Sequence, residues 1–219
     1  MEPITTQENQ SALDEYRLVL AAQKGDLEAF NELVLMYQDA VYGIAYRILG
    51  EPDAAEDITQ EVFLTAFRKF TTFRNGSFRS WLFRITTNAC YDELRRRKRH
   101  PLLSIDSADG KEENPSLPYD TLKQTTSPEQ ICERRELQQA VQRALNELNP
   151  DQRAVVILID LQEMDYEEAA RILQVPVGTV KSRLARARER LRQVLVRQTA
   201  KHGSSPFSGE KIEEILSPV

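Results

Sequence analysis

The 219-residue chain has few of the residues that build disulfides and metal sites. Its only cysteines, Cys90 and Cys132, form no C-x-x-C pair, and its only histidines, His100 and His202, lie in basic or Gly/Ser-rich surroundings. Because no metal-ligand spacing results, we expect no metal. The cysteines are interpreted as reduced structural thiols, with a redox sensor as the alternative.

Long hydrophobic runs and a signal-peptide pattern are also missing. The longest unbroken apolar run, from Ala154 to Ile159, is far shorter than the roughly 20 residues that span a bilayer. The N-terminus has no basic segment followed by an apolar one. We therefore expect a cytoplasmic protein with no membrane insertion of its own.

The usual signatures of catalysis are scarce as well. The sequence has no Gly-rich phosphate loop and no histidine near a candidate nucleophile, and its carboxylates are distributed as helix caps and exposed faces. We expect no enzyme, no catalytic residue and no cofactor.

Positive charge is concentrated in two blocks of a chain whose net charge is −5. Residues 68–100 hold ten Lys or Arg against two acids, and residues 171–201 hold nine against one. A phosphate backbone responds to such local clusters rather than to the overall charge. The two blocks predict two nucleic-acid contact surfaces.

Helical periodicity dominates the sequence, and no strand-like alternation of useful length is present. Gly50 is a natural helix terminator, Asp53 and Glu56 resemble a capping box, and Asn149 followed by Pro150 is typical of a helix start. We predict an all-α fold of two small helical domains joined by a flexible acidic linker. The predicted parts are a polar N-terminal arm (1–12), a first domain (13–100), the linker (101–133), a second domain (134–201) and a C-terminal tail (202–219).

The second basic block has the pattern of a helix-turn-helix. A capped helix at 165–173 is followed by a break at Pro176 and a new helix from Val177. The apolar stripe of that helix packs inward, which leaves a polar face flanked by arginines to reach base edges and phosphates of duplex DNA. A solvated surface helix is the alternative. The predicted DNA-contacting residues are Thr179, Lys181, Ser182, Arg183, Arg186 and Arg190.

The first basic block is interleaved with aromatic residues, an arrangement that suits unstacked bases. Core packing nevertheless accounts better for Phe63, Phe67, Phe70 and Trp81. The opposite side of the helix predicted over 77–99 can hold a single strand, with a solvated basic helix end or a nonspecific patch as alternatives. The candidate residues on that side are Arg84, Thr87, Asn88, Tyr91 and Arg95.

A third surface lies on the helix predicted from Asp53 to Phe70. Its outward face combines Leu64 with Asp57, Gln60 and Glu61. A leucine among carboxylates suits a basic protein partner, although a single exposed leucine is common.

The order of these parts resembles that of extracytoplasmic-function (ECF) sigma factors of bacterial RNA polymerase. The resemblance rests on three segments in the first half, Asp26 to Phe30, Asp53 to Phe63 and Ser77 to Ile85, and on Pro176 to Arg188 in the second half. It covers roughly residues 15 to 198. The chain departs from many relatives at Thr86 and Thr87, and it extends beyond the match after Lys201.

The resemblance implies a transcription initiation factor without catalytic activity of its own. The first domain would dock on the clamp coiled coil of core RNA polymerase through the Leu64 surface and capture the melted minus-ten element, with Asn88 beside a flipped base. The second domain would read the duplex minus-thirty-five element and meet the polymerase flap, and the acidic linker would thread toward the RNA path. A cognate anti-sigma factor, which can hold the protein at the inner membrane, is a further implied partner.

A stand-alone helix-turn-helix regulator is the competing prediction, because residues 149–198 alone fit the output domain of many activators. Such a regulator binds duplex promoter DNA without core polymerase, whereas a sigma factor opens promoters only with it.

Overall fold

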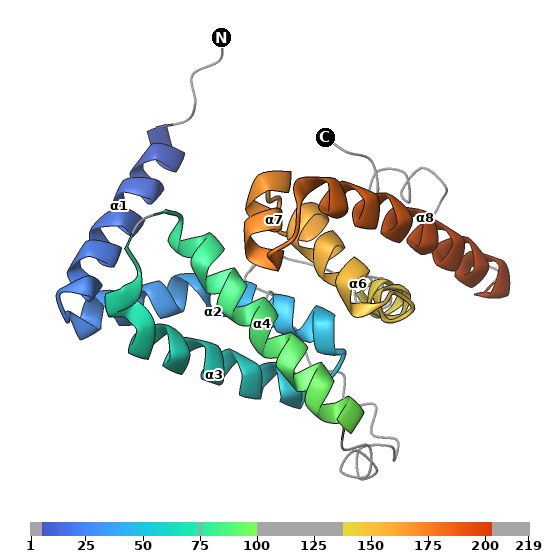
Figure 1. Ribbon diagram of the computed structural model, residues 1–219, viewed down its shortest axis with the longest axis horizontal. Coiled ribbons are helices and arrows are strands. Elements are labelled where there is room, and N and C mark those ends of the chain that lie inside the picture. The colour runs from blue at the N-terminus through green and yellow to red at the C-terminus, as the bar shows by residue number, and fades with distance from the viewer. Residues whose placement is uncertain (1–5, 75, 100–137, 203–219) are drawn as a thin grey trace, which may run out of the picture.

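The computed structural model describes residues 6–74, 76–99 and 138–202. Every regular element in these ranges is a helix, as predicted. The helices form an N-terminal unit (residues 6–99) and a C-terminal unit (residues 138–202), which lie against one another in Figure 1. The predicted linker and most of the predicted tail fall outside the described residues.

The N-terminal unit consists of four α-helices and one short 3₁₀ turn. Its elements are α1 (Thr6–Gln23), α2 (Leu27–Leu49), α3 (Pro52–Lys69), the 3₁₀ turn η1 (Phe70–Thr72) and α4 (Phe78–Arg99). Helix α2 lies at the centre and contacts α1, α3 and α4. Residues such as Leu33, Val41 and Ile44 on α2 are fully buried for that reason.

Local signals fix most helix ends in this unit. The Asp26 side chain accepts hydrogen bonds from the backbone N–H groups of Glu28 and Ala29, and Gly50 ends α2 with a φ of 81°, which a residue with a Cβ adopts only under strain. The predicted capping box at Asp53 is wrong. Helix α3 begins earlier, with Glu51 at the cap position and Pro52 as its first helical residue.

Two further expectations for the N-terminal unit need correction. Helix α1 begins at Thr6, so the second half of the predicted polar arm is helical. Phe67, predicted to be a core residue, is 49% exposed, although its ring makes an edge-to-face contact with Phe30 with ring centroids 5.2 Å apart. Phe70 is buried as expected, whereas Phe63 and Trp81 are half-buried.

The C-terminal unit begins with helical residues 138–146. It continues with α6 (Pro150–Val156), a π-helical turn η3 (Ile157–Leu161), α7 (Tyr166–Leu173) and α8 (Val177–His202). The predicted caps at its helix starts are confirmed: Asn149 accepts from the Gln152 N–H and Asp165 from the Glu168 N–H. Among the described helices, none is long and apolar enough to cross a membrane.

Candidate nucleic-acid and protein interfaces

Helices α7 and α8 form the predicted helix-turn-helix. Gln174 ends α7 in the left-handed conformation, with a φ of 55°, and α8 begins three residues later. Val180, Leu184, Ala187 and Leu191 are buried against α6 and α7, as their helical spacing predicts. The opposite face of α8 is therefore the exposed one.

Lys181, Ser182 and Arg186, which are predicted DNA contacts, are exposed on that face. The Lys181 ammonium lies 5.4 Å from the centre of the Tyr166 ring, a cation–π contact that connects α8 to the start of α7. Thr179 is half-buried, and its carbonyl accepts a hydrogen bond from the Ser182 hydroxyl. Side chains on this part of the helix can reach base edges in the major groove.

Two other predicted DNA contacts on α8 are engaged with carboxylates. Arg183 pairs with Asp151 at 2.6 Å and is half-buried, while the more exposed Arg190 pairs with Glu147 at 3.2 Å. These carboxylates come from α6 and from the segment before it, so they orient the guanidinium groups along one side of α8. Either arginine can contact a DNA phosphate only if the phosphate replaces its carboxylate partner.

A similar ion pair is structural. Arg188 donates to Asp160 at 2.6 Å, and this hydrogen bond raises the pKa of the guanidinium above its ordinary value. Asp160 lies in the π-helical turn η3, so the ion pair joins this turn to α8. The ion pair therefore holds α8 against the π-helical turn.

On α4, the predicted single-strand face is only partly open. Arg84, Asn88 and Arg95 are exposed, and Arg95 makes a 3.0 Å ion pair with Asp92 one turn earlier. Both members of that pair are more than 70% exposed, so solvent weakens it and a phosphate can replace the carboxylate.

Thr87 does not belong to this face, and the prediction that placed it there is wrong. It is 1% exposed, and its hydroxyl donates to the Phe83 carbonyl at 2.8 Å. Thr86 makes the same kind of bond to Leu82. Helical spacing alone placed Thr87 beside Arg84 and Asn88, but a neighbouring element covers this position.

Tyr91 is half-buried, which also departs from the prediction of an open stacking surface. Its hydroxyl oxygen is buried next to Asp151 and Arg183 of the C-terminal unit. Burial, followed by the nearby negative charge of Asp151, raises the pKa of Tyr91 above its ordinary value. The phenol is therefore neutral, and its polar end faces protein rather than solvent.

The end of α4 carries an arginine run whose charge is partly compensated. Glu93 accepts from Arg96 at 2.7 Å and from Arg97 at 2.8 Å, and these bonds lower the pKa of its carboxyl. Arg97 also reaches Glu51, at the start of α3, at 2.7 Å. Lys98 and Arg99 are exposed, so the tip of the helix keeps its positive charge.

The third predicted surface, on α3, is exposed as expected. Leu64 is 55% exposed, and Asp57, Gln60 and Glu61 share its side of the helix while Val62 and Ala66 face the core. Phe67, three residues after Leu64 on the same helix, is exposed as well. The surface is thus more apolar than the sequence pattern indicated.

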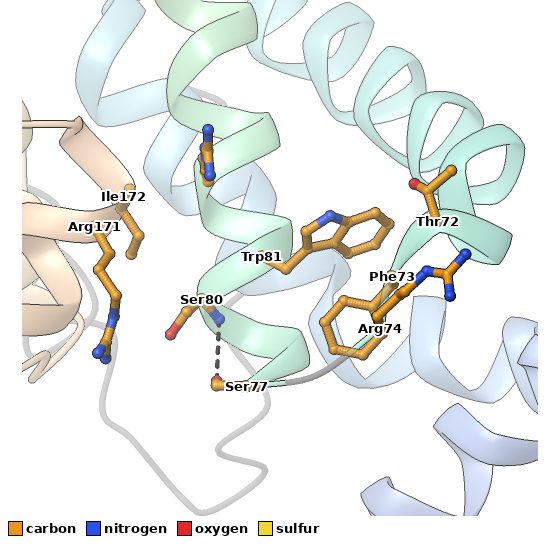
Figure 2. Close-up of a pocket in the computed structure, with 10 residues that line it drawn as sticks. Thr72, Phe73, Arg74, Ser77, Ser80, Trp81, Arg171 and Ile172 are labelled. Carbon is orange, nitrogen blue, oxygen red and sulfur yellow. Dashed lines mark hydrogen bonds between the residues drawn. The ribbon is translucent and has the colours of Figure 1, made fainter.

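Sequence reasoning missed a cavity of about 630 Å³ between the loop after η1, helix α4 and helix α7. Figure 2 shows Phe73 and Trp81 on one side of it and Arg171 and Ile172, from the C-terminal unit, on the other. Arg74 and Arg84 also line it. The aromatic and arginine residues at 73–84 were the available signal, but the contribution of Arg171 depends on tertiary packing.

Of the two cysteines, Cys90 is buried, and burial raises the pKa of its thiol to about 12. A protonated thiol with no solvent access is a poor nucleophile, which favours the structural interpretation. Cys132 lies outside the described residues, as does His100. Among the described residues, no group of three or more His, Cys, Asp or Glu is placed to hold a metal ion.

Two family models match the chain. Sigma-70 region 2 matches residues 33–100, and Sigma-70, region 4 matches residues 138–191. The first match covers most of the N-terminal unit but leaves out α1. The second contains the helix-turn-helix.

Curated relatives match over most of the chain. The chain is 38% identical over 179 residues to the ECF RNA polymerase sigma factor SigE of Mycolicibacterium smegmatis, a match that covers 81% of this chain but only 64% of that longer protein. It is 36% identical to SigW of Bacillus subtilis, covering 79% of this chain and 92% of SigW. It is 39% identical to the sigma-E factor of Escherichia coli, covering 78% and 89%.

Solved structures similar to this one include two complexes. The sigma factor RpoE of Bartonella quintana, solved with the anti-sigma factor NepR, aligns with a TM-score of 0.59 and 31% identity over 77% of this chain and 98% of RpoE. CnrH, solved with the cytosolic domain of CnrY, aligns with a TM-score of 0.60 and 26% identity over 83% of this chain and 97% of CnrH.

Proposed function

The chain belongs to the ECF sigma factors of bacterial RNA polymerase. On this basis we propose a role for each of its three surfaces in promoter recognition. The protein binds core RNA polymerase, directs it to specific promoters and helps melt the minus-ten element. The observation that carries this assignment is that one chain combines an exposed helix-turn-helix face with a second, different polar face that presents Asn88.

The exposed face of α3 is the surface for core polymerase. Leu64 supplies apolar area at its centre, and Asp57, Gln60 and Glu61 supply the negative and polar surroundings that suit a basic partner. Because none of these four side chains is buried in the fold, they are available without rearrangement of α3.

The open part of α4 contacts the melted strand of the minus-ten element. Asn88 offers both a donor and an acceptor to a base edge, while Arg84 and Arg95 neutralise phosphates. A protein that binds an unstacked base lowers the free energy of the melted strand relative to the duplex, and this favours promoter melting.

Helix α8 reads the duplex minus-thirty-five element. Lys181, Ser182 and Arg186 are exposed in its first half, and Arg183 and Arg190 flank them. The central side chains reach base edges, and the flanking arginines exchange their carboxylate partners for phosphates. Counterion release makes this contact sensitive to salt.

An anti-sigma factor is the proposed protein regulator. Support comes from the similar sigma factor RpoE, whose solved structure contains the anti-sigma factor NepR. We place the protein in the cytoplasm, where the polymerase is, with retention at the inner membrane when the anti-sigma factor is itself membrane-bound.

In vitro transcription with purified core polymerase separates the sigma factor from a stand-alone regulator. On a library of promoter fragments, core enzyme alone gives no specific transcripts, and we expect specific transcripts only when this protein is added. The decisive control supplies the complete chain without core enzyme. Strong, sequence-specific duplex binding under that condition, with no dependence of transcription on the protein, contradicts the proposed function and favours the regulator.

A further inference from the structure

One wall of the cavity between the loop after η1, helix α4 and helix α7 is aromatic. Phe73 and Trp81 both line it, with ring centroids 5.2 Å apart and ring planes inclined by 45°. Phe70 and Phe78, which are buried, contact the indole of Trp81 at 6.0 and 5.7 Å and hold it in place. Trp81 is nevertheless only half-buried, so a planar ring that enters the cavity can stack on it.

Positive charge surrounds this wall. Arg74 from the loop, Arg84 from α4 and Arg171 from α7 line the cavity. Their side chains are exposed, and within residues 6–74, 76–99 and 138–202 no ion pair or hydrogen bond engages any of them. Arg95 and Arg96, at the other end of α4, instead pair with carboxylates of their own helix. Guanidinium groups without counterions around one cavity favour an anion with several negative charges.

Negative charge does not oppose an anion in the cavity. Of the described residues that line it, none is Asp or Glu. The Glu168 carboxylate of α7 lies next to it, but this carboxylate already accepts a hydrogen bond from the Ser80 hydroxyl at 2.9 Å. The Ser77 hydroxyl oxygen accepts from the Ser80 N–H at 3.1 Å, as Figure 2 shows, and so keeps its own proton to donate to a ligand.

The volume and the lining together select a class of ligand. Sites for small molecules typically measure ~300–1,000 Å³, and the cavity, at about 630 Å³, falls within this range. A nucleoside di- or triphosphate has both of the groups that the lining suits, because its base can stack on Trp81 and its phosphates can pair with the arginines. An inorganic phosphate lacks the ring, and an uncharged aromatic molecule leaves the guanidinium groups unpaired.

We propose that this cavity is a binding site for a free nucleoside di- or triphosphate, whose base stacks on Trp81 and whose phosphates bind Arg74, Arg84 and Arg171. Arg74 and Arg171 belong to none of the three surfaces of the proposed function. The ligand site is therefore distinct from the polymerase and promoter contacts, except at Arg84.

Arg84 connects the ligand site to promoter recognition. In the proposed function this arginine neutralises a phosphate of the melted strand. A guanidinium that binds the phosphates of a nucleotide is lost to the strand, so an occupied site weakens single-strand binding. This consequence rests on the proposed function, whereas the binding of the nucleotide does not.

The chain carries a natural probe of this site, because Trp81 is its only tryptophan and intrinsic tryptophan fluorescence reports on the cavity alone. The complete free protein is titrated with ATP, GTP, adenosine and inorganic tripolyphosphate, and isothermal titration calorimetry gives each affinity. We expect ATP or GTP to quench Trp81 and to bind at least ~10-fold more tightly than adenosine or tripolyphosphate, because only a nucleotide combines stacking with charged hydrogen bonds.

Two substitutions locate the bound nucleotide. Arg74→Ala and Arg171→Ala should each weaken its binding ~5–10-fold, because each removes charge-assisted hydrogen bonds to phosphate. The matched control is Arg68→Ala, which removes the same charge from an exposed position of α3 outside the cavity and should change the affinity by less than ~2-fold, since solvent screens distant charges. Circular dichroism melting confirms that each variant keeps its fold.

Absence of binding by both ATP and GTP contradicts the proposal, and so do equal affinities for Arg68→Ala, Arg74→Ala and Arg171→Ala. Tripolyphosphate that binds as tightly as the nucleotides also contradicts it, because stacking then contributes nothing.

A labelled 12-nucleotide single-stranded DNA tests the consequence at Arg84. Saturating nucleotide should weaken its binding to the wild type by roughly 3-fold or more, through the loss of one phosphate contact. Unchanged DNA affinity alongside clear nucleotide binding refutes the competition at Arg84 and leaves the ligand site standing. Failure of the wild type to support transcription with core enzyme refutes the proposed function, but it does not alter the nucleotide result.

Discussion

Arg153 is the residue whose replacement most directly tests the physical account of the fold. It is 9% exposed, yet it carries a full charge, and burial lowers the pKa of its guanidinium. It donates to three carbonyls, at 2.6, 3.0 and 3.1 Å, while its Nε atom is buried without a hydrogen-bond partner. The benefit of three charged hydrogen bonds therefore opposes the cost of burying a cation that is not fully satisfied.

The substitution Arg153→Met keeps most of the aliphatic packing and removes all three bonds. Hydrogen bonds to charged groups contribute ~1.5–3 kcal/mol each, but relief of the buried charge returns part of that sum. We expect a net loss of about 2–4 kcal/mol in the free energy of unfolding. For a chain of this size the corresponding fall in melting temperature is about 5–15 °C.

Urea unfolding followed by circular dichroism measures this loss. The control is Arg143→Met on the helix before α6, where the arginine is exposed and the change should cost less than ~0.5 kcal/mol. Arg153→Lys should fall between the two, because an ammonium is a point charge without the planar fork of Arg. If Arg153→Met is as stable as Arg143→Met, the desolvation cost cancels the hydrogen bonds and Arg153 does not hold the units together.

Three further predictions address the proposed surfaces. Leu64→Arg should abolish co-elution with core polymerase in gel filtration without changing the melting temperature, since the side chain is 55% exposed; retained association refutes the docking surface. Asn88→Ala should reduce permanganate reactivity of the melted minus-ten region more than it reduces closed-complex binding, and equal reductions would remove its base-capture role. Arg186→Ala should weaken binding to the preferred minus-thirty-five sequence by ~1–3 kcal/mol and relax base preference, whereas a uniform loss on all sequences would indicate a phosphate contact.

The helices and their local caps were largely readable from the sequence. Asn149, Asp165 and Gly50 act within one turn of their own positions, so short-range chemistry was sufficient to place those helix ends. The prediction that α3 starts at a capping box on Asp53 was wrong, because Pro52 is a stronger signal for the first helical position than a carboxylate one residue later. The exposed faces of α3 and α8 followed from helical spacing, because each helix packs on its own unit along one stripe.

What the sequence by itself determined is the set of helices, the helix-turn-helix and the order of the proposed DNA and polymerase surfaces. Each of these depends on residues close together in the chain. Tertiary structure alone decided that Thr87 is buried, that Tyr91 points at Asp151, and that Arg171 helps to line a cavity with Trp81. The physical reason is that these environments depend on residues far away in the sequence, such as Asp151 for Tyr91, and helical periodicity cannot tell which outward face a distant part of the chain will cover.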